Sequence, residues 1–279
     1  MSKFCVILPA AGKSSRYGDR NYKKQFAMLN NQAVWLHSAT LFLNRSDVAQ
    51  VIVVVAPEDR EMFESKFRAN IAILGITVVE GGRERADSIQ NAIAAIRPEC
   101  DFVAVHDAAR PCVTDALVSD VFRVARRTGA AILAIPVADT MKKVEPVRNA
   151  KRAARKEPKV LSLDSLIPDD PEEDTSDVGD GRILGTLDRT NVWAAQTPQV
   201  FRRDWFEELY AKRDRNSSLQ TDDAMLFEAA GKSVSVVEGS AMNLKITTKD
   251  DLKMAEAILR IQSKGPKKPI HPFDDDRFD

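Results

Sequence analysis

The chain of 279 residues has only three cysteines and three histidines, and it has no apolar run long enough to cross a membrane. Cys5, Cys100 and Cys112 lie too far apart for a disulfide framework or a zinc site, so we expect buried, reduced thiols in a cytoplasmic protein. A signal-peptide pattern is also missing, because Lys3 is followed by only a short apolar run.

The sequence also lacks an excess of charge of either sign, since Lys plus Arg and Asp plus Glu both number 41. This balance does not indicate a nucleic-acid or membrane partner, so any electrostatic site must be a local cluster. Two common nucleotide fingerprints are absent as well, namely GxGxxG and GxxxxGK followed by Ser or Thr. Their absence disfavours a Rossmann dehydrogenase and a P-loop ATPase.

The first strongly patterned stretch runs from Phe4 to Arg16. Phe4 to Leu8 is short and wholly apolar, which predicts a strand buried on both faces at the start of a parallel sheet. The small residues Pro9, Ala10, Ala11 and Gly12 follow, and Lys13, Arg16 and Lys24 add positive charge nearby. This pattern fits a turn that binds a phosphate chain, although a simple tight connection fits equally well.

An alternation of strands and helices continues along the chain and predicts an α/β fold with one main domain. We expect strands at 51–55, 77–80, 102–105, 130–137 and 233–237, and helices at 32–43, 57–67, 83–96, 114–127, 224–230 and 250–261. Further structure is expected at 191–197, followed by a helix that ends near 212, and residues 221–223 are expected to cap the helix at 224.

Two strand ends carry residues suited to a ligand. Gly81 and Gly82 form either a simple turn or an edge against which a planar base can lie, with Ser88 facing it from the next helix. Asp107 follows the strand at 102–105. It is a candidate to bind a ribose hydroxyl or a divalent metal, or else to cap the following turn. His106 is expected to pack behind the strand and not to act in catalysis.

The composition changes from Glu145 to Gly185, which contains a basic run, an acidic run and few periodic apolar residues. We interpret this segment as a flexible or edge-hairpin insertion. Residues 263–279 are Pro-rich and charged, and we expect a disordered tail there.

Several motifs occur together and in one order, and together they resemble the 2-C-methyl-D-erythritol 4-phosphate cytidylyltransferases of the non-mevalonate isoprenoid pathway. They are LPAAGKSSR (8–16), KKQF (23–26), GGRERADS (81–88), VHDAARP (105–111), DTMK (139–142), DRTNVWAAQTPQVF (188–201), TDDA (221–224) and NLKIT (243–247). The chain departs from the family's usual GxGxRM turn and PKQ motif, and Ala138 stands where many members have Arg.

The resemblance implies a Rossmann-like nucleotidyltransferase fold at 1–262, with a mostly parallel twisted sheet flanked by helices. It also implies a dimerisation arm at 138–190, containing the charged insertion, and hence a homodimer. The implied reaction is Mg²⁺-dependent transfer of a cytidylyl group from CTP to a sugar-alcohol phosphate, 2-C-methyl-D-erythritol 4-phosphate. No general base is needed, because the nucleophile is an ionised phosphate.

The resemblance also implies roles for individual residues, with Arg16, Lys24 and Lys245 as the catalytic cations. Nucleotide contacts are implied for Pro9, Ala10, Ala11, Gly12, Lys13, Ser14, Ser15, Gly82, Ser88, Asp107 and Ala108. Acceptor contacts are implied for Asp107, Arg110, Thr140, Arg189, Thr197, Thr221 and Lys245, with Arg189 and Thr197 reaching the partner subunit's site. We assign no direct side-chain metal ligand, although Asp107 is a candidate.

Two alternatives remain open from the sequence. Ribitol-5-phosphate cytidylyltransferase has a similar fold and similar nucleotide motifs but a different acceptor. A regulatory subunit that binds a nucleotide without turnover is the other, and the presence of Arg16, Lys24 and Lys245 argues against it.

Overall fold

The computed structural model describes residues 2–12, 23–146, 181–213 and 222–263. The chain divides into a main unit, Met1–Ile135 with Ala194–Asp279, and a smaller unit, Pro136–Trp193. Among the described helices, none combines the length and the apolar character needed to span a membrane.

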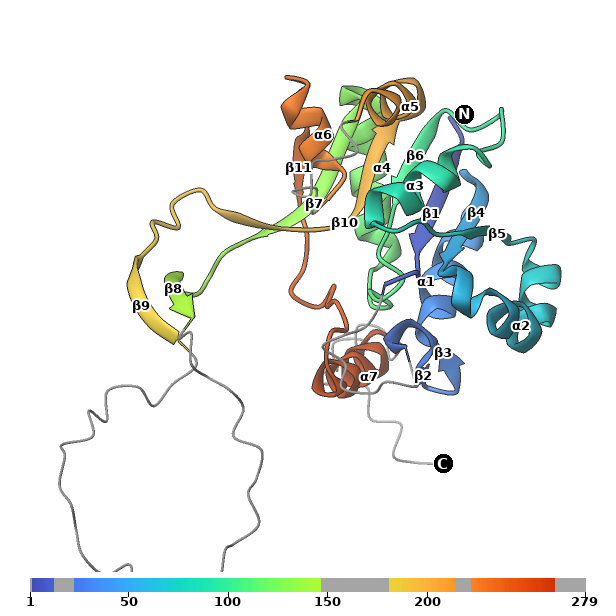
Figure 1. Cartoon of the computed structure of the whole chain (residues 1–279), viewed down its shortest axis with the longest axis horizontal. Coiled ribbons are helices and arrows are strands. Elements are labelled where there is room, and N and C mark those ends of the chain that lie inside the picture. Colours follow the sequence, from blue (N-terminus) through green and yellow to red (C-terminus); the bar gives the residue numbers. More distant parts are fainter. Residues whose placement is uncertain (1, 13–22, 147–180, 214–221, 264–279) are drawn as a thin grey trace, which may run out of the picture. The chain divides into compact units, whose positions relative to one another are not determined.

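A seven-stranded sheet with the order β11-β7-β10-β6-β1-β4-β5 forms the centre of the main unit (Figure 1). Its strands are β1 (Phe4–Pro9), β4 (Val48–Val55), β5 (Thr77–Glu80), β6 (Phe102–Val105), β7 (Ala130–Pro136), β10 (Trp193–Arg202) and β11 (Ser235–Glu238). β1 pairs in parallel with β4 and β6, β4 with β5, and β7 with β11, whereas β10 runs antiparallel to β6. The predicted mostly parallel α/β fold is confirmed.

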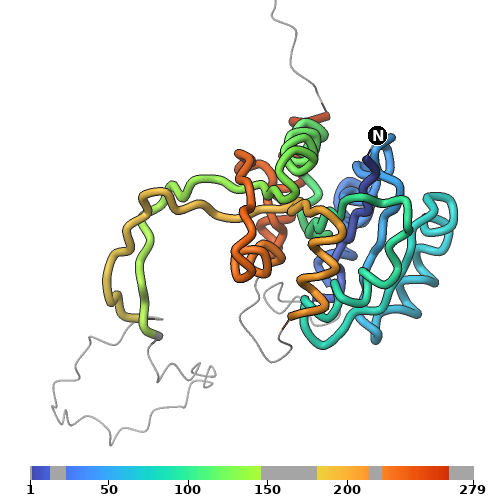
Figure 2. The backbone as a smooth tube through the Cα atoms, turned by 90° about the horizontal axis from the view of Figure 1, so that it is seen from above, coloured from blue at the N-terminus to red at the C-terminus, as the bar shows by residue number. Residues whose placement is uncertain are grey.

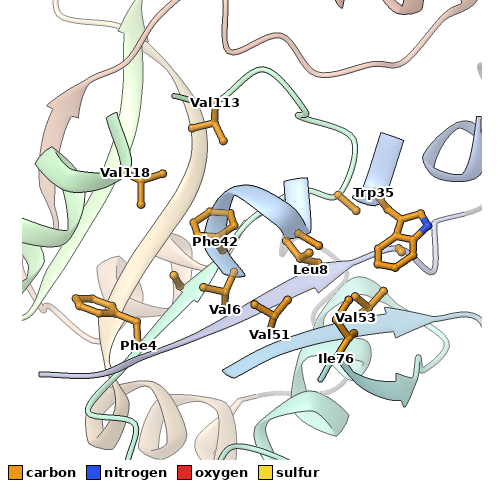
Figure 3. Close-up of a cluster of buried hydrophobic side chains, with 14 of the residues drawn as sticks. Phe4, Val6, Leu8, Trp35, Phe42, Val51, Val53, Ile76, Val113 and Val118 are labelled. Atoms are coloured by element: carbon orange, nitrogen blue, oxygen red, sulfur yellow. The ribbon is translucent and has the colours of Figure 1, made fainter. Parts of the chain in front are cut away.

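Helices cover both faces of this sheet, which explains why the strand that opens it is apolar throughout. Phe4, Val6 and Leu8 belong to one core cluster, while Cys5 and Ile7 belong to the cluster on the opposite face. Figure 3 shows the first cluster, in which strand residues meet side chains of the neighbouring helices. A strand buried on both sides needs a continuous hydrophobic run and not an alternating one.

The described helices are α1 (Val34–Leu43), α2 (Arg60–Leu74), α3 (Arg85–Ile93), α4 (Asp115–Thr128), α5 (Arg203–Lys212), α6 (Ala224–Ala229) and α7 (Lys249–Ser263). Gly75 and Gly129 end α2 and α4 with left-handed backbone, at φ values of 62° and 88°. Glycine adopts this conformation without a steric penalty, and it satisfies the last carbonyl groups of a helix.

Several predicted boundaries are wrong. The helix expected from residue 32 begins at Val34, because β2 (Met28–Leu29) and β3 (Gln32–Ala33) form a hairpin whose Asn30 and Asn31 have positive φ. Asparagine is one of the residues that tolerates this turn geometry. The helix expected at 57–67 is a 3-10 turn, Pro57–Asp59, followed by α2, which continues to Leu74.

The smaller unit contains an antiparallel pair, β8 (Lys142–Pro146) and β9 (Gly181–Thr186), which run side by side in Figures 1 and 2. These strands lie at the two ends of the segment that we interpreted as an insertion. The middle of that segment and the predicted tail from residue 264 lie outside the described residues.

The three cysteines are free and buried, as predicted.

Candidate active site

A cavity of about 940 Å³ lies in the main unit, beyond the carboxyl ends of β1, β4, β5 and β6. Because β10 is antiparallel to β6, the beginning of its paired segment meets this same edge of the sheet. Open α/β sheets generally bind ligands at this edge. The charged residues that line the cavity are Lys24, Glu58, Arg83, Glu84, Arg85, Asp107, Arg110, Asp222 and Lys245.

The turn after β1 forms one wall of the cavity. Pro9 to Gly12 line it, and the backbone N–H of Ala10 donates to Val54 O at 2.7 Å. The buried side chain of Gln25 donates through Nε2 to Ala10 O at 2.5 Å and to Gly12 O at 3.4 Å. Gln25 therefore shapes this turn, a role that our sequence analysis missed although KKQF was among the quoted motifs.

The Gly81-Gly82 turn forms a second wall and packs closely. A Cβ atom at Gly81 would lie 2.8 Å from Ala11 Cβ and 2.9 Å from Ser88 Oγ, so the site requires glycine. The Ser88 hydroxyl accepts from Gly82 N at 3.0 Å and donates to Glu84 O at 3.1 Å. Ser88 thus holds the turn in addition to lining the cavity.

Asp107 is the centre of a charged cluster at the end of β6. Its Oδ2 lies 2.8 Å from Lys245 Nζ and 3.3 Å from Arg110 Nε, and Arg110 Nη1 donates to Asn243 O at 2.7 Å. Burial alone would raise the pKa of Asp107, but Lys245, Arg85 and Arg110 together lower this pKa well below its usual range. Asp107 is therefore an ionised carboxylate held between cations.

His106 and Thr197 lie directly behind Asp107. Asp107 N donates to Thr197 Oγ1 at 3.0 Å, this hydroxyl lies 3.1 Å from His106 Nδ1, and His106 Nε2 lies 3.1 Å from Arg110 O. His106 is fully buried and absent from the cavity lining, as predicted. Burial lowers the pKa of His106 to about 4, so this side chain is neutral near neutral pH.

A second charged network, around Asp223, was not predicted. Its buried carboxylate lies 2.6 Å from Arg85 Nη2 and accepts from the Tyr210 hydroxyl at 2.5 Å. Gln199 Oε1 accepts from the backbone N–H groups of Asp223 and Ala224. We expected residues 221–223 to act as a cap, and the cap bond is made by Asp222, whose Oδ1 accepts from Met225 N at 3.2 Å.

The cavity brings together all of the predicted site residues that the structure describes in the main unit: Pro9, Ala10, Ala11, Gly12, Lys24, Gly82, Ser88, Asp107, Ala108, Arg110, Thr197 and Lys245. Thr197 lines the cavity of its own chain, where its hydroxyl accepts from Asp107 N. Its expected reach into a partner's site stays a prediction. Lys13, Ser14, Ser15, Arg16 and Thr221 lie outside the described residues. Thr140 and Arg189 belong to the smaller unit.

The cavity offers hard oxygen donors for a metal but no complete cage. Within the described part of the chain, no three His, Cys, Asp or Glu side chains are grouped so that they could hold a metal ion. Mg²⁺ usually binds one or two carboxylates together with substrate phosphates. The ionised carboxylate of Asp107 suits such a site, provided that a ligand supplies the remaining oxygens.

The buried, neutral state of His106 predicts a pH dependence of stability. Below about pH 6.5 the unfolded chain takes up a proton at this histidine, whereas the folded chain does so only near pH 4, so acid favours unfolding. Between pH 7 and pH 5 the free energy of unfolding should fall by roughly 2 kcal/mol more in the wild type than in His106→Gln. Urea denaturation at both pH values measures the difference, and equal losses in the two proteins would contradict the buried neutral assignment.

Comparison with known proteins gives one consistent result. The chain matches the model of the family described as 2-C-methyl-D-erythritol 4-phosphate cytidylyltransferase (IspD) over residues 4–160 and 147–261. The two segments overlap inside the predicted insertion.

Proteins of that name are similar over almost their whole length. The one from Alkaliphilus oremlandii is 34% identical over 269 residues, which cover 95% of this chain and 98% of that protein. The one from Bacillus anthracis is 33% identical over 261 residues, or 94% of this chain and 100% of that protein. The Francisella tularensis structure of that name matches with a TM-score of 0.69 at 28% identity, covering 92% of this chain and 100% of its own. The chain therefore belongs to the 2-C-methyl-D-erythritol 4-phosphate cytidylyltransferase family.

Proposed function

We propose that this chain transfers the cytidylyl group of CTP to 2-C-methyl-D-erythritol 4-phosphate, giving 4-diphosphocytidyl-2-C-methyl-D-erythritol and pyrophosphate. The observation that carries the proposal is the cavity at the strand ends, which joins a small-residue turn, a glycine edge and the Asp107 cluster in a member of this family. These features suit a nucleotide, whose base needs close backbone approach and whose phosphates need cations.

Each wall then has a role in binding. Ala10, Ala11, Gly82 and Ser88 would hold the cytosine, and Asp107 and Ala108 the ribose. Gly12, Lys13, Ser14, Ser15, Arg16, Lys24 and Lys245 would contact phosphates. The acceptor would be held by Asp107, Arg110, Thr140, Arg189, Thr197, Thr221 and Lys245, with Thr197 acting in its own chain.

The chemistry requires little covalent help from the protein. An oxygen of the acceptor's phosphate attacks the α-phosphorus of CTP, and the bond to the bridging oxygen of the β-phosphate breaks, so that pyrophosphate leaves with that electron pair. The attacking oxygen is already ionised, and catalysis consists of bringing anions together and stabilising the charge of the transition state. Lys24 and Lys245 line the cavity, and their positive charges would supply this stabilisation.

We further propose Mg²⁺ as the cofactor, held mainly by the triphosphate, with Asp107 as the protein ligand that fits. Such an ion neutralises charge on the transferred and leaving phosphates. The three free, buried cysteines suit a reducing compartment, which supports the cytoplasm as the location.

The smaller unit supports assembly into a homodimer. A hairpin of two strands is marginally stable by itself, and here it exposes apolar side chains. Val144, Ile183, Leu184 and Leu187 are each at least 50% exposed. Clusters of exposed apolar residues are typical of protein interaction surfaces, and a second copy of the hairpin would cover them symmetrically.

The activity itself is tested by pyrophosphate release from CTP and Mg²⁺ with candidate acceptors in parallel. We expect turnover with methylerythritol phosphate and little turnover with ribitol 5-phosphate. ATP should be a poor donor, because a site built around hydrogen bonds to a pyrimidine leaves those groups unpaired when a purine is bound. Turnover with ribitol phosphate alone would replace the proposed acceptor, and CTP binding without any turnover would favour a regulatory role.

Removal of a cavity cation should affect the chemical step more than CTP binding. We predict that Lys24→Ala and Lys245→Ala each lower kcat by roughly a hundredfold, the scale observed when one preorganised electrostatic donor is lost. Lys253→Ala, which removes an exposed lysine of α7, is the matched control and should leave kcat unchanged. Near-normal kcat in both cavity variants at saturating substrate would refute the assigned role of charge.

Shared active sites are tested by mixing subunits. If Arg189 serves the partner's site, a mixture of Arg189→Ala and Lys24→Ala chains contains heterodimers with one intact site. Activity should then recover after subunit exchange, whereas either variant alone stays weak. Mass spectrometry can show that the subunits have exchanged. If activity still does not recover after exchange, Arg189 serves its own chain or has no role.

A further inference from the structure

His106 is buried behind the candidate site and touches two of its parts. Its side chain is 0% exposed and packs against Phe42, with ring centroids 5.1 Å apart. One ring nitrogen lies near the Thr197 hydroxyl and the other near Arg110 O. A substrate in the cavity would not reach His106, so any role in the reaction must pass through these neighbours.

The positions of the protons follow from what each partner can do. Arg110 O only accepts, so His106 Nε2 carries the proton and donates to it at 3.1 Å. In the neutral ring Nδ1 must then accept, which makes Thr197 the donor at 3.1 Å. The Thr197 oxygen in turn accepts from Asp107 N at 3.0 Å. The direction of all three hydrogen bonds is thereby defined.

These bonds hold both ends of the short loop that carries Asp107 and Arg110. The loop starts at Asp107 N, bound to Thr197, and ends at Arg110 O, bound to His106. Ile246 N also donates to Ala109 O at 2.8 Å, which places the neighbouring Lys245 in register with the loop. The backbone segments that carry Asp107, Arg110 and Lys245 are therefore tied together, and the two cations meet at Asp107 Oδ2.

We propose that His106 is a positioning residue which, together with Thr197, holds Asp107 and Arg110 in the geometry that binds the acceptor. This inference rests on the proposed function. It also changes the expected role of Thr197, because its hydroxyl proton is given to His106 and is not available to a phosphate. Thr197 then acts on the acceptor through Asp107.

Two substitutions and their combination test the proposal. His106→Phe keeps an aromatic ring against Phe42 but removes both ring nitrogens, and Thr197→Val removes the hydroxyl at nearly constant shape. Phe42→Leu is the matched control, because it disturbs the packing of the same ring but none of the three bonds. The measurements are kcat, the KM values for CTP and for methylerythritol phosphate, and amide hydrogen exchange at residues 107–110.

Each single variant should lower kcat/KM for the acceptor by about tenfold or more, the effect of a misplaced binding group, with a smaller change in the KM for CTP. The double variant should be about as impaired as the worse single variant, because both changes break one network. Exchange at residues 107–110 should be faster in all three, while Phe42→Leu should lose stability and keep its kinetic constants.

Additive effects of the two substitutions would contradict the shared network, because Thr197 would then contact the acceptor independently. Unchanged hydrogen exchange at residues 107–110 would overturn the proposal outright. If the wild type does not turn over methylerythritol phosphate, the proposed function fails, and the exchange measurement still decides whether His106 holds the loop. Should His106→Phe not fold, His106→Gln retains an amide donor for Arg110 O but no acceptor at the Nδ1 position. Unchanged acceptor kinetics and unchanged exchange in that variant and in Thr197→Val would equally overturn the proposal.

Discussion

The candidate site depends on one ionised carboxylate, Asp107, which is held between Lys245 and Arg110 at the end of a central strand. A largely buried charge is stable only when it is paired and hydrogen-bonded, so the surrounding backbone must place both cations accurately. That backbone is tied to the sheet through Thr197, because β10 runs antiparallel to β6 and brings this residue to the edge where β6 ends.

The proposed reaction needs no activated nucleophile from the protein, because the attacking phosphate oxygen is already ionised. His106, which lies behind the cavity, is buried, neutral and engaged with Thr197 and Arg110, and the free cysteines are buried in the core. What the cavity offers is charge and shaped backbone, namely Lys24, Lys245, the turn after β1 and the glycine turn after β5. Positioned charge and backbone can catalyse phosphoryl-group transfer, since the attacking oxygen is already ionised and pyrophosphate is a good leaving group.

The sequence was informative where a local pattern has one physical cause. The apolar run from Phe4 to Leu8 predicted a strand buried on both faces, and His106 was expected to pack behind its strand. The Asp223 network could not be predicted, because Arg85 lies 138 positions away and only the fold brings its guanidinium to this carboxylate. The contact between Thr197 and Asp107 was missed for the same reason, since the antiparallel register that brings the two residues together is not visible in the sequence.

In the proposed mechanism, positioned charge catalyses direct attack on the α-phosphorus, and no covalent enzyme intermediate forms. The most direct measurement uses CTP made chiral at the α-phosphorus by a sulfur atom, with methylerythritol phosphate as acceptor, followed by determination of the product's configuration. A single in-line displacement inverts the configuration, so we expect inversion. Retention would require two displacements through a nucleotidylated side chain, and it would contradict direct attack by the acceptor.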